Sequence, residues 1–151
     1  MKLYVQKFDE LTRDDLYAIL QERFEVFACE QKITCENEFD GKDKNCVHIY
    51  AKDGDKIAAY LRILPKGLSY EDAPSIGRVL VKKEYRGYRL SNVVLKEAIK
   101  YIKENFNDKK IKISSQLYIK DLYKSLGFYE VSDVYDEAEI PHIKMIYDIE
   151  N

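Results

Sequence analysis

The chain has 151 residues, 46% of them hydrophobic, and carries 25 Lys and Arg against 27 Asp and Glu, a net charge of −2. This balance excludes a global basic field that would draw the protein to nucleic acid or to an anionic membrane, so any anion site has to be local. The length and the low count of three Pro predict one compact domain over residues 1–151, without a disordered tail or an interdomain linker.

The cysteines predict the compartment. Cys29, Cys35 and Cys46 have a spacing that fits no zinc pattern, so we expect no metal. The first residues lack the apolar core of a signal peptide, and no apolar run is long enough to span a membrane. We therefore expect a cytoplasmic protein with free thiols. Cys35 lies in a polar stretch, where it is either a reactive thiol or an inert one.

The amino-terminal part predicts a strand, a helix and a long polar loop. Residues 2–8 alternate as a strand, and Thr12 with Asp15 three positions later resembles a capping box that starts the helix. The apolar stripe of this helix, its expected buried face, consists of Leu16, Ile19, Leu20, Phe24 and Phe27. Residues 30–45 then form a polar loop that contains Glu30, Glu36, Glu38, Asp40 and Asp43. This acidic loop either attracts a cationic substrate or is a solvated surface; both interpretations fit the sequence.

The central part predicts three strands and a long helix. Residues 47–51 and 57–64 form a hairpin around the turn signal at 52–55, and residues 76–81 form a short buried strand. Residues 82–89 are a basic turn with a glycine. The apolar face of the following helix is expected to comprise Leu90, Val93, Val94, Ala98 and Ile102. Such a turn before a helix amino terminus is either a phosphate site or plain scaffold.

The carboxyl-terminal part predicts a short strand over residues 111–114 and a helix over 117–126 that Gly127 ends as a C′ residue. Residues 128–134 and 142–149 are expected to close the fold as an antiparallel pair. A strand–helix–strand unit around the long helix implies parallel neighbours, whereas the hairpins imply antiparallel ones. The fold class is therefore α/β of the α+β type, a mixed sheet with helices on both faces.

Two stretches resemble motifs of a known family. Residues 79–91 have the sequence VLVKKEYRGYRLS, and downstream Gln116 precedes LYKSLGF at 122–128. The first stretch resembles the acetyl-CoA motif R/Q-x-x-G-x-G/A of the GNAT superfamily of N-acetyltransferases. The second is similar to its Asn-led helix that ends in L-Y-x-x-L-G-F. Resemblance to the ElaA-like branch is carried by Val26-Phe27, Glu30-Gln31, Asp40-Gly41, His48 and Ile140-Pro141-His142-Ile143.

The resemblance implies a single GNAT-like domain in which the sheet splays at the cofactor site and the pantetheine arm of acetyl-CoA lies in the gap like an added strand. It implies direct transfer of the acetyl group to a primary amine in a ternary complex. The cofactor-binding residues that it implies are Val79, Leu80, Val81, Arg86, Gly87, Tyr88, Arg89, Leu90, Ser91, Asn92 and Gln116.

The sequence departs from the family pattern at three of these positions. Arg89 and Ser91 occupy the two small-residue positions of the signature, and Gln116 replaces Asn. The Arg89 side chain either crowds the pyrophosphate or adds a positive charge to its site. Lys83, Arg86 and Arg89 are expected to neutralise the pyrophosphate or the 3′-phosphate, with solvated surface as the alternative for each.

The same resemblance assigns the chemistry. Tyr123 is the expected general acid, because a phenol can donate a proton to the departing CoA thiolate; packing in the core is the alternative role. An alkyl amine is mostly protonated at neutral pH, so a base or water must take its proton. The candidates for this base are Glu30, Glu38, Asp40, His48 and His142, of which we select Glu30 and His142; each histidine could equally be structural.

The resemblance also leaves a rival function. A non-catalytic acyl-CoA-binding sensor or interaction module could use the same fold, and a structural domain without a cofactor is the third interpretation. For an enzyme, the expected partner is a small-molecule or peptide amine. A homodimer through exposed sheet edges is a further expectation.

Overall fold

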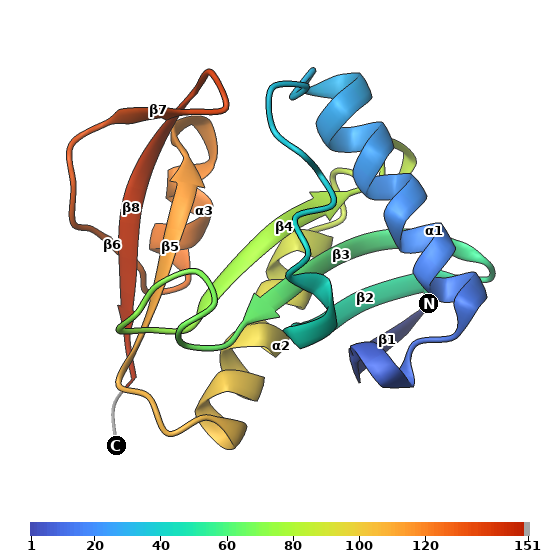
Figure 1. Cartoon of the computed structure of the whole chain (residues 1–151), viewed down its shortest axis with the longest axis horizontal. Coiled ribbons are helices and arrows are strands. Elements are labelled where there is room, and N and C mark those ends of the chain that lie inside the picture. Colours follow the sequence, from blue (N-terminus) through green and yellow to red (C-terminus); the bar gives the residue numbers. More distant parts are fainter. Residues whose placement is uncertain (150–151) are drawn as a thin grey trace.

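A computed structural model describes residues 1–149 as two antiparallel sheets with three α-helices (Figure 1). The amino-terminal sheet has the order β1-β2-β3-β4, with β1 (Lys2–Lys7), β2 (Val47–Asp53), β3 (Lys56–Leu64) and β4 (Ser75–Val81). The carboxyl-terminal sheet has the order β5-β8-β6, with β7 paired to β8; its strands are β5 (Lys110–Gln116), β6 (Tyr129–Glu130), β7 (Tyr135–Glu137) and β8 (Ile140–Asp148). The helices are α1 (Arg13–Arg23), α2 (Leu90–Asn105) and α3 (Lys120–Ser125).

The two sheets meet at the beginning of β4 and β5. The backbone N–H of Lys112 donates to the carbonyl of Pro74 at 3.0 Å. Beyond this contact the two strands diverge toward their carboxyl ends (Figure 1). The α/β fold expected from the sequence and the splay implied by the family resemblance are therefore confirmed. In place of one mixed sheet the structure has two sheets with antiparallel pairing inside each, and a parallel approach only where β4 meets β5.

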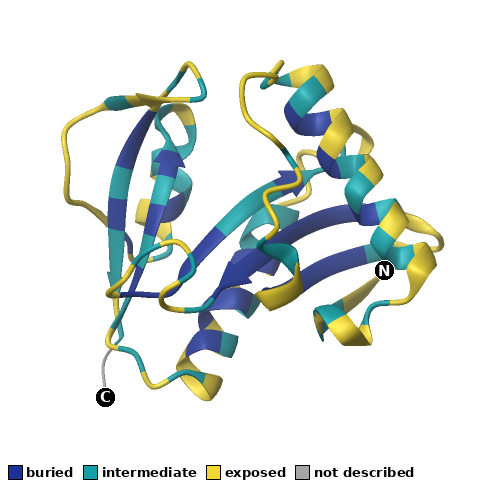
Figure 2. Ribbon diagram, viewed as in Figure 1, coloured by how far each residue is buried: buried dark blue, intermediate teal, exposed yellow. Residues whose placement is uncertain are grey.

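Helices α1 and α2 cover opposite faces of the amino-terminal sheet (Figure 1). On the α2 face the buried core includes Val94, Leu95, Ala98, Ile99 and Ile102 of the helix with Ile49, Leu61 and Ile63 of the sheet. On the α1 face a second cluster contains Ile19, Val26, Phe27, Tyr50, Tyr60 and Leu80. Because both faces are covered, β2 and β3 are buried almost throughout (Figure 2). Each fully buried Leu or Ile contributes roughly 1.5–3 kcal/mol of apolar burial.

The first helix presents a different face from the one expected. Phe24 is 54% exposed, whereas Arg23 is fully buried. The prediction for Phe24 was wrong because it assumed that a charged residue faces water, and Arg23 instead finds carboxylate partners inside the protein. At this point α1 continues as a π-helix over Phe24–Glu30. On α2 the prediction for Val93 was also wrong: it is exposed, and Leu95 and Ile99 take inward positions.

The carboxyl-terminal elements are shorter than expected. The predicted helix starts as a 3-10 turn at Leu117–Ile119 and is α-helical only over α3. Gly127 has the left-handed φ of 109° that ends this helix, as predicted, and a Cβ there would lie 3.0 Å from the Tyr147 ring. Of the predicted strand 128–134 only β6 forms a ladder with β8, followed by one bond from the Val131 N–H to the Lys144 carbonyl at 2.9 Å, and β7 forms a separate hairpin with β8. Across residues 1–149, no helix combines the length and the hydropathy that crossing a membrane requires.

Candidate active site

A β-bulge interrupts β4 beside the gap between the sheets. Tyr60 of β3 pairs with Leu80 and Arg62 pairs with Gly77, so Arg78 and Val79 together stand opposite Leu61. Arg78 has a left-handed φ of 52°, a conformation that is uncommon for a residue with a side chain. The sequence held one signal of this bulge, since an isolated glycine such as Gly77 inside a strand pattern often marks one.

Backbone groups of both strands face the gap without a partner strand. Lys82 N–H donates to Ala58 O at 2.9 Å, so in this antiparallel ladder the next hydrogen-bonded pair is Tyr60–Leu80. Val79 and Val81, the residues on either side of Leu80, point their backbone groups away from β3. On β5 the same alternation, starting from the bond between Lys112 and Pro74, turns the backbone of Ser114 and Gln116 toward β4.

The residues of the acetyl-CoA motif therefore divide into two groups. Val79 and Val81 reach the gap with their backbone, and Val79 and Gln116 line the pocket described below. Leu80 does not reach the gap, because its side chain is buried on the α1 face and its backbone is directed at β3.

The basic turn after β4 is partly neutralised by the protein itself. Lys82 forms an ion pair of 2.6 Å with Glu22. Arg86 forms one of 2.8 Å with Glu30, and its Nε donates to the carbonyl of Val81 at 2.9 Å. Lys83 and Arg89 have no ion-pair partner within residues 1–149, which leaves two cations of the turn available to a ligand.

The turn leads into the amino terminus of α2, where Arg89 is the N-cap. Arg89 has a left-handed φ of 59°, and its side chain makes no capping hydrogen bond. The amides of Leu90, Ser91 and Asn92 therefore open the helix with no side-chain cap. Gly87 also has a positive φ, 92°, and Tyr88 is exposed. The arrangement offers backbone N–H groups and a helix dipole to an anion.

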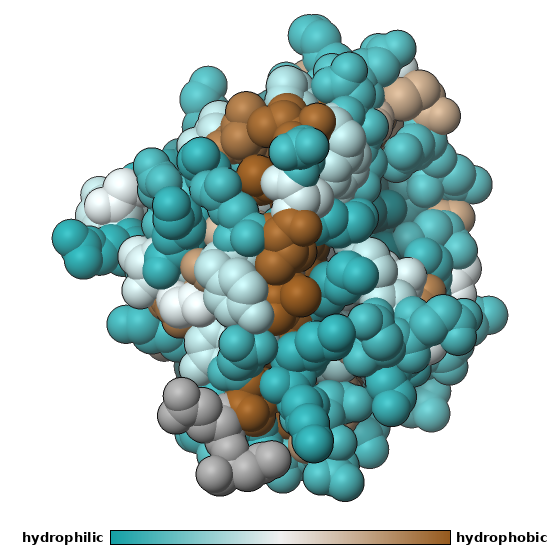
Figure 3. Space-filling model, turned by 90° about the vertical axis from the view of Figure 1, so that its left-hand side faces the viewer, coloured by the Kyte–Doolittle hydropathy of each residue, from teal (hydrophilic) through white to brown (hydrophobic). Residues whose placement is uncertain are grey.

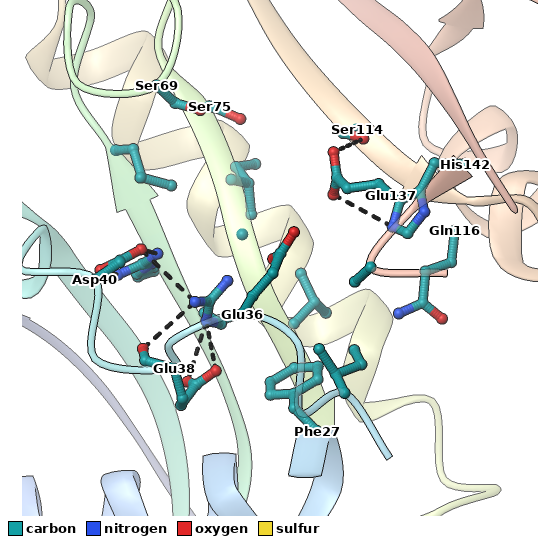
Figure 4. Close-up of a pocket in the computed structure, with 18 of the residues that line it drawn as sticks. Phe27, Glu36, Glu38, Asp40, Ser69, Ser75, Ser114, Gln116, Glu137 and His142 are labelled. Atoms are coloured by element: carbon teal, nitrogen blue, oxygen red, sulfur yellow. Dashed lines mark hydrogen bonds and ion pairs between the residues drawn. The ribbon is translucent and has the colours of Figure 1, made fainter. Parts of the chain in front are cut away.

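A pocket of about 420 Å³ occupies the mouth of the gap (Figure 4). The π-helix and the loop after it form one wall, β4 forms the floor, and β5, α3 and the β7–β8 hairpin form the other wall. Across the pocket, Gln116 Nε2 of β5 donates to Gln31 Oε1 at 2.9 Å. This hydrogen bond joins the two walls of the pocket.

Tyr123 lies in the wall that α3 contributes. Its ring is buried against Phe128 in an edge-to-face contact with centroids 5.7 Å apart, and the residue lines the pocket. Burial raises the pKa of Tyr123 above its usual range, so the phenol keeps its proton at neutral pH. No hydrogen bond within residues 1–149 involves its hydroxyl, and the residue lines the pocket. The phenol is therefore available to donate to a ligand there.

The two expected bases occupy different places. Glu30 pairs with Arg86 and is not among the residues that line the pocket. His142 lines the pocket and is buried, with Gln116 as its partner in the β5–β8 ladder. His48 is buried away from the pocket, between the hydroxyl of Tyr60 at 2.7 Å and the carbonyl of Asp43 at 3.0 Å. The structure thus brings Tyr123 and His142 to one cavity and leaves Glu30 outside its lining.

The acidic loop is neither a solvated surface nor an open cation trap, because the protein turns most of its carboxylates inward. Glu38, Asp40 and Asp43 face Arg23, Arg62 and Arg78, and we call these six residues the arginine–carboxylate cluster. Its ion pairs join Arg23 to Glu38 at 2.6 Å and to Asp43 at 2.7 Å, Arg62 to Asp40 at 2.5 Å and to Asp43 at 3.0 Å, and Arg78 to Glu38 at 3.0 Å. Three charges of each sign balance, and the cluster fastens the loop to α1, β3 and β4. A charged residue inside the apolar run 57–64 was the available signal for Arg62.

The cysteines are all free. Cys29 and Cys35 are exposed, and Cys46 is buried, where desolvation raises the pKa of its thiol to about 12. In the part of the chain that the structure describes, no three His, Cys, Asp or Glu side chains are grouped as a metal site.

Two diverging sheets, a helix amino terminus beside the gap and a pocket at its mouth define an acyl-CoA N-acyltransferase fold. The crystal structure of an acyl-CoA N-acyltransferase from Pseudomonas aeruginosa matches with a TM-score of 0.88 and 33% identity, covering 97% of this chain and 99% of that one.

The sequence model of the Acetyltransferase (GNAT) domain matches residues 10–149, and the chain belongs to this family. ElaA of Escherichia coli is 33% identical over 142 residues, 93% of this chain and 92% of ElaA. The crystal structure of Escherichia coli ElaA has a TM-score of 0.89 and 30% identity, covering 97% of this chain and 98% of that one. The predicted resemblance to the GNAT superfamily and to its ElaA-like branch is confirmed.

Proposed function

We propose that the protein is an N-acetyltransferase that transfers the acetyl group of acetyl-CoA to a primary amine by direct attack in a ternary complex. Residues 1–151 would form one catalytic domain. The observation that carries the proposal is the gap between β4 and β5, where two rows of backbone groups lack a partner strand. Unpaired backbone groups are costly, and a ligand with amides of its own resolves that deficit, although the Val81 carbonyl already accepts from Arg86 Nε at 2.9 Å.

The proposed cofactor position follows from the chemistry of the gap. The amides of the pantetheine arm would pair with the backbone of Val79 and Val81. The side chain of Gln116 would give up its hydrogen bond to Gln31 and bond the arm instead. The same edge supplies the donor for the reaction, because a backbone N–H aimed at the thioester oxygen stabilises the developing oxyanion by about 3 kcal/mol. Support also comes from an aminoglycoside 6′-N-acetyltransferase solved with coenzyme A, which shares the fold at a TM-score of 0.72 and 13% identity.

The phosphates would lie at the amino terminus of α2. Its first amides and the cations Lys83 and Arg89 are available there, and a phosphate would compete with Glu30 for Arg86. Ser91 adds a hydroxyl at the position where the family has a small residue.

For the acid we propose Tyr123, whose protonated hydroxyl has no other partner and lies at the same pocket as His142. As the C–S bond breaks, this hydroxyl donates to the CoA thiolate. For the base we favour His142 over Glu30, because His142 lines the pocket whereas Glu30 does not and is paired with Arg86.

We also propose a cytoplasmic location and assembly as a homodimer. Three free cysteines suit the reducing cytoplasm. The exposed residues Tyr129 and Val131 lie on or beside β6, and exposed Val134 directly precedes β7. The face that contains β6 shows a stripe of apolar side chains (Figure 3). A second copy bound at this edge would give a homodimer.

The test of the proposed function is release of CoA thiol from acetyl-CoA in the presence of a panel of primary amines: diamines, polyamines, aminoglycosides, lysine and peptides with a free amino terminus. Thiol release that depends on one of these amines, with the acetylated amine found by mass spectrometry, supports the proposal. Tight binding of acetyl-CoA without turnover of any amine would instead favour the acyl-CoA sensor.

A further inference from the structure

Glu137 is placed at the pocket by an unusual turn. It is the last residue of β7, and Ala138 and Glu139 alone connect it to β8. Both turn residues are left-handed, with φ of 52° and 63°. This two-residue turn with positive φ normally uses Asn and Gly, because other side chains are strained in it. Strained backbone of this kind is found preferentially at functional sites.

The Glu137 carboxylate is not neutralised by a cation. It lines the pocket with its side chain 43% exposed, and within residues 1–149 neither Lys nor Arg forms an ion pair with it. One oxygen accepts a hydrogen bond from Ser114 Oγ at 3.1 Å, and the other lies 3.5 Å from His142 Nε2 (Figure 4). Glu137 differs in this from Glu38 and Asp40, which line the same pocket but are paired with arginines.

The hydrogen bonds of His142 determine which of its ring nitrogens is basic. Nδ1 lies 2.7 Å from the carbonyl oxygen of Ile140, which can only accept, so Nδ1 carries the proton. Nε2 of the neutral ring therefore has its lone pair directed to the Glu137 side. Tyr135 stacks on the ring with centroids 6.2 Å apart and fixes its plane. A proton that reaches Nε2 lies beside a carboxylate oxygen of Glu137, which is 3.5 Å from this nitrogen.

The other charged and titratable groups around this pair leave its negative charge exposed to the pocket. Lys144 of β8 donates to Tyr70 at 3.1 Å and lies over the rings of Tyr70 and Tyr135, rather than against Glu137. The Tyr135 hydroxyl is hydrogen-bonded to Ser114. From the opposite wall Glu36 lines the pocket as a further carboxylate that, within residues 1–149, has no ion pair with Lys or Arg, and Lys42 lines the loop side.

We propose that Glu137 binds the ammonium group of the acceptor and that, together with His142, it takes the proton that this ammonium must lose. The inference rests on the proposed function and names the acceptor as a cationic alkyl amine. Glu36 lies where it would favour acceptors with a second positive charge, such as diamines.

The proton balance is complete without another reactant. The ammonium gives one proton to His142 Nε2, and the neutral nitrogen forms a bond to the thioester carbonyl carbon. The C–S bond breaks as the intermediate collapses, and Tyr123 protonates the thiolate. The nitrogen gives up a second proton, which restores Tyr123 through solvent, and the proton on His142 leaves to solvent. The products are the amide, CoA thiol and one proton.

The kinetic test compares Glu137→Gln with Glu139→Gln. The second variant removes the same charge two residues further along the chain, from a side chain that does not line the pocket. We expect Glu137→Gln to raise the KM for the amine about tenfold or more, since a charge-assisted contact is lost, and to leave the KM for acetyl-CoA within about twofold. The deficit in kcat/KM should shrink as the pH approaches the amine pKa of about 10, because a neutral amine needs neither the ion pair nor the base. An unchanged KM for the amine, or a deficit that is independent of pH, would overturn the proposal.

A second readout needs no turnover. The chain has two histidines, so a ¹⁵N-histidine spectrum contains two rings, and His142→Gln assigns them. With the protein saturated with CoA, 1,4-diaminobutane should shift the His142 signals in the parent and in Glu139→Gln but not in Glu137→Gln. The His48 signals should not move. The neutral His142 ring should carry its proton on Nδ1. Equal shifts in Glu137→Gln, no response of His142 in the parent, or the other tautomer would each refute the proposal. Because calorimetry with acetyl-CoA is measured on the same preparations before CoA is added, loss of the amine site is distinguished from loss of the cofactor site.

Discussion

Replacement of Asp43 by asparagine tests whether the arginine–carboxylate cluster holds the loop on the protein. Asp43 Oδ1 accepts hydrogen bonds from Arg23 at 2.7 Å and from Arg62 at 3.0 Å. The two arginine side chains are only 1% and 3% exposed, so water cannot replace the lost charge. Asparagine keeps the shape but leaves the cluster with one uncompensated positive charge.

The expected cost is about 3 kcal/mol of unfolding free energy, the lower end of what breaking a buried ion pair costs, because two carboxylates of the cluster remain. This is a large share of the total stability of roughly 5–15 kcal/mol that a domain of this kind has. The measurement is urea unfolding at neutral pH, with the slope of the transition checked to be unchanged. Glu84→Gln is the control, since its pair with Lys82 is 3.9 Å long and its side chain is 60% exposed, and it should cost at most about 0.5 kcal/mol.

The pH dependence gives the same test a second form. Although burial alone would raise it, hydrogen bonding and charge from Arg23 and Arg62 hold the pKa of Asp43 below its usual value. A carboxyl with a lowered folded pKa contributes stability that is complete above its unfolded pKa of about 3.9 and is lost as the pH falls through the folded pKa. The difference in unfolding free energy between the parent and Asp43→Asn should therefore be constant from neutral pH to about pH 5 and should decrease below about pH 4. A cost under about 1 kcal/mol at neutral pH, or one equal to that of Glu84→Gln, would refute the reasoning.

Three further predictions concern the site. Tyr123→Phe should lower kcat about tenfold or more while the affinity for acetyl-CoA measured by calorimetry stays within about twofold; equal turnover would remove Tyr123 from the chemistry. Arg89→Gly should raise the unfolding free energy by roughly 0.5–1 kcal/mol, because relief of its left-handed backbone exceeds the added chain entropy of glycine. Lys83→Ala is the control, because it removes the same positive charge from the turn. A lower unfolding free energy in Arg89→Gly would contradict the proposed backbone strain at this position. Finally, the dissociation constant for acetyl-CoA should rise with ionic strength, and less steeply in a Lys83→Ala/Arg89→Ala double variant; identical slopes would show that these two cations do not contact the phosphates.

Local sequence signals predicted the parts of the fold that depend on near neighbours. Thr12 Oγ1 accepts from the Asp15 amide at 3.0 Å, as the spacing indicated, although the Asp15 carboxylate turns to Tyr50 and Lys52 instead of closing the capping box. The glycine turns lie where expected, with Gly54 between β2 and β3 and Gly127 after α3. The splay at the gap came from the family resemblance, since no residue in β4 or β5 states by itself that the strands diverge.

The predictions that were wrong concern residues whose partners lie far along the chain. Arg23 is buried because Glu38 and Asp43 lie 15 and 20 residues later, and nothing near Arg23 announces them. The same distance conceals the loop carboxylates, which look like a solvated surface until β3 and β4 supply Arg62 and Arg78. The left-handed conformation of Arg89 was equally hidden, since Arg is not a residue that favours it.

The proposed function depends most directly on binding of acetyl-CoA in the gap between β4 and β5, and calorimetric titration of the purified protein with acetyl-CoA measures this binding. We predict one site per chain with a dissociation constant in the micromolar range, despite Arg89 and Ser91 in the small-residue positions, because the backbone edges and the α2 amides remain available. No heat of binding at millimolar acetyl-CoA would contradict the proposed function and its mechanism together.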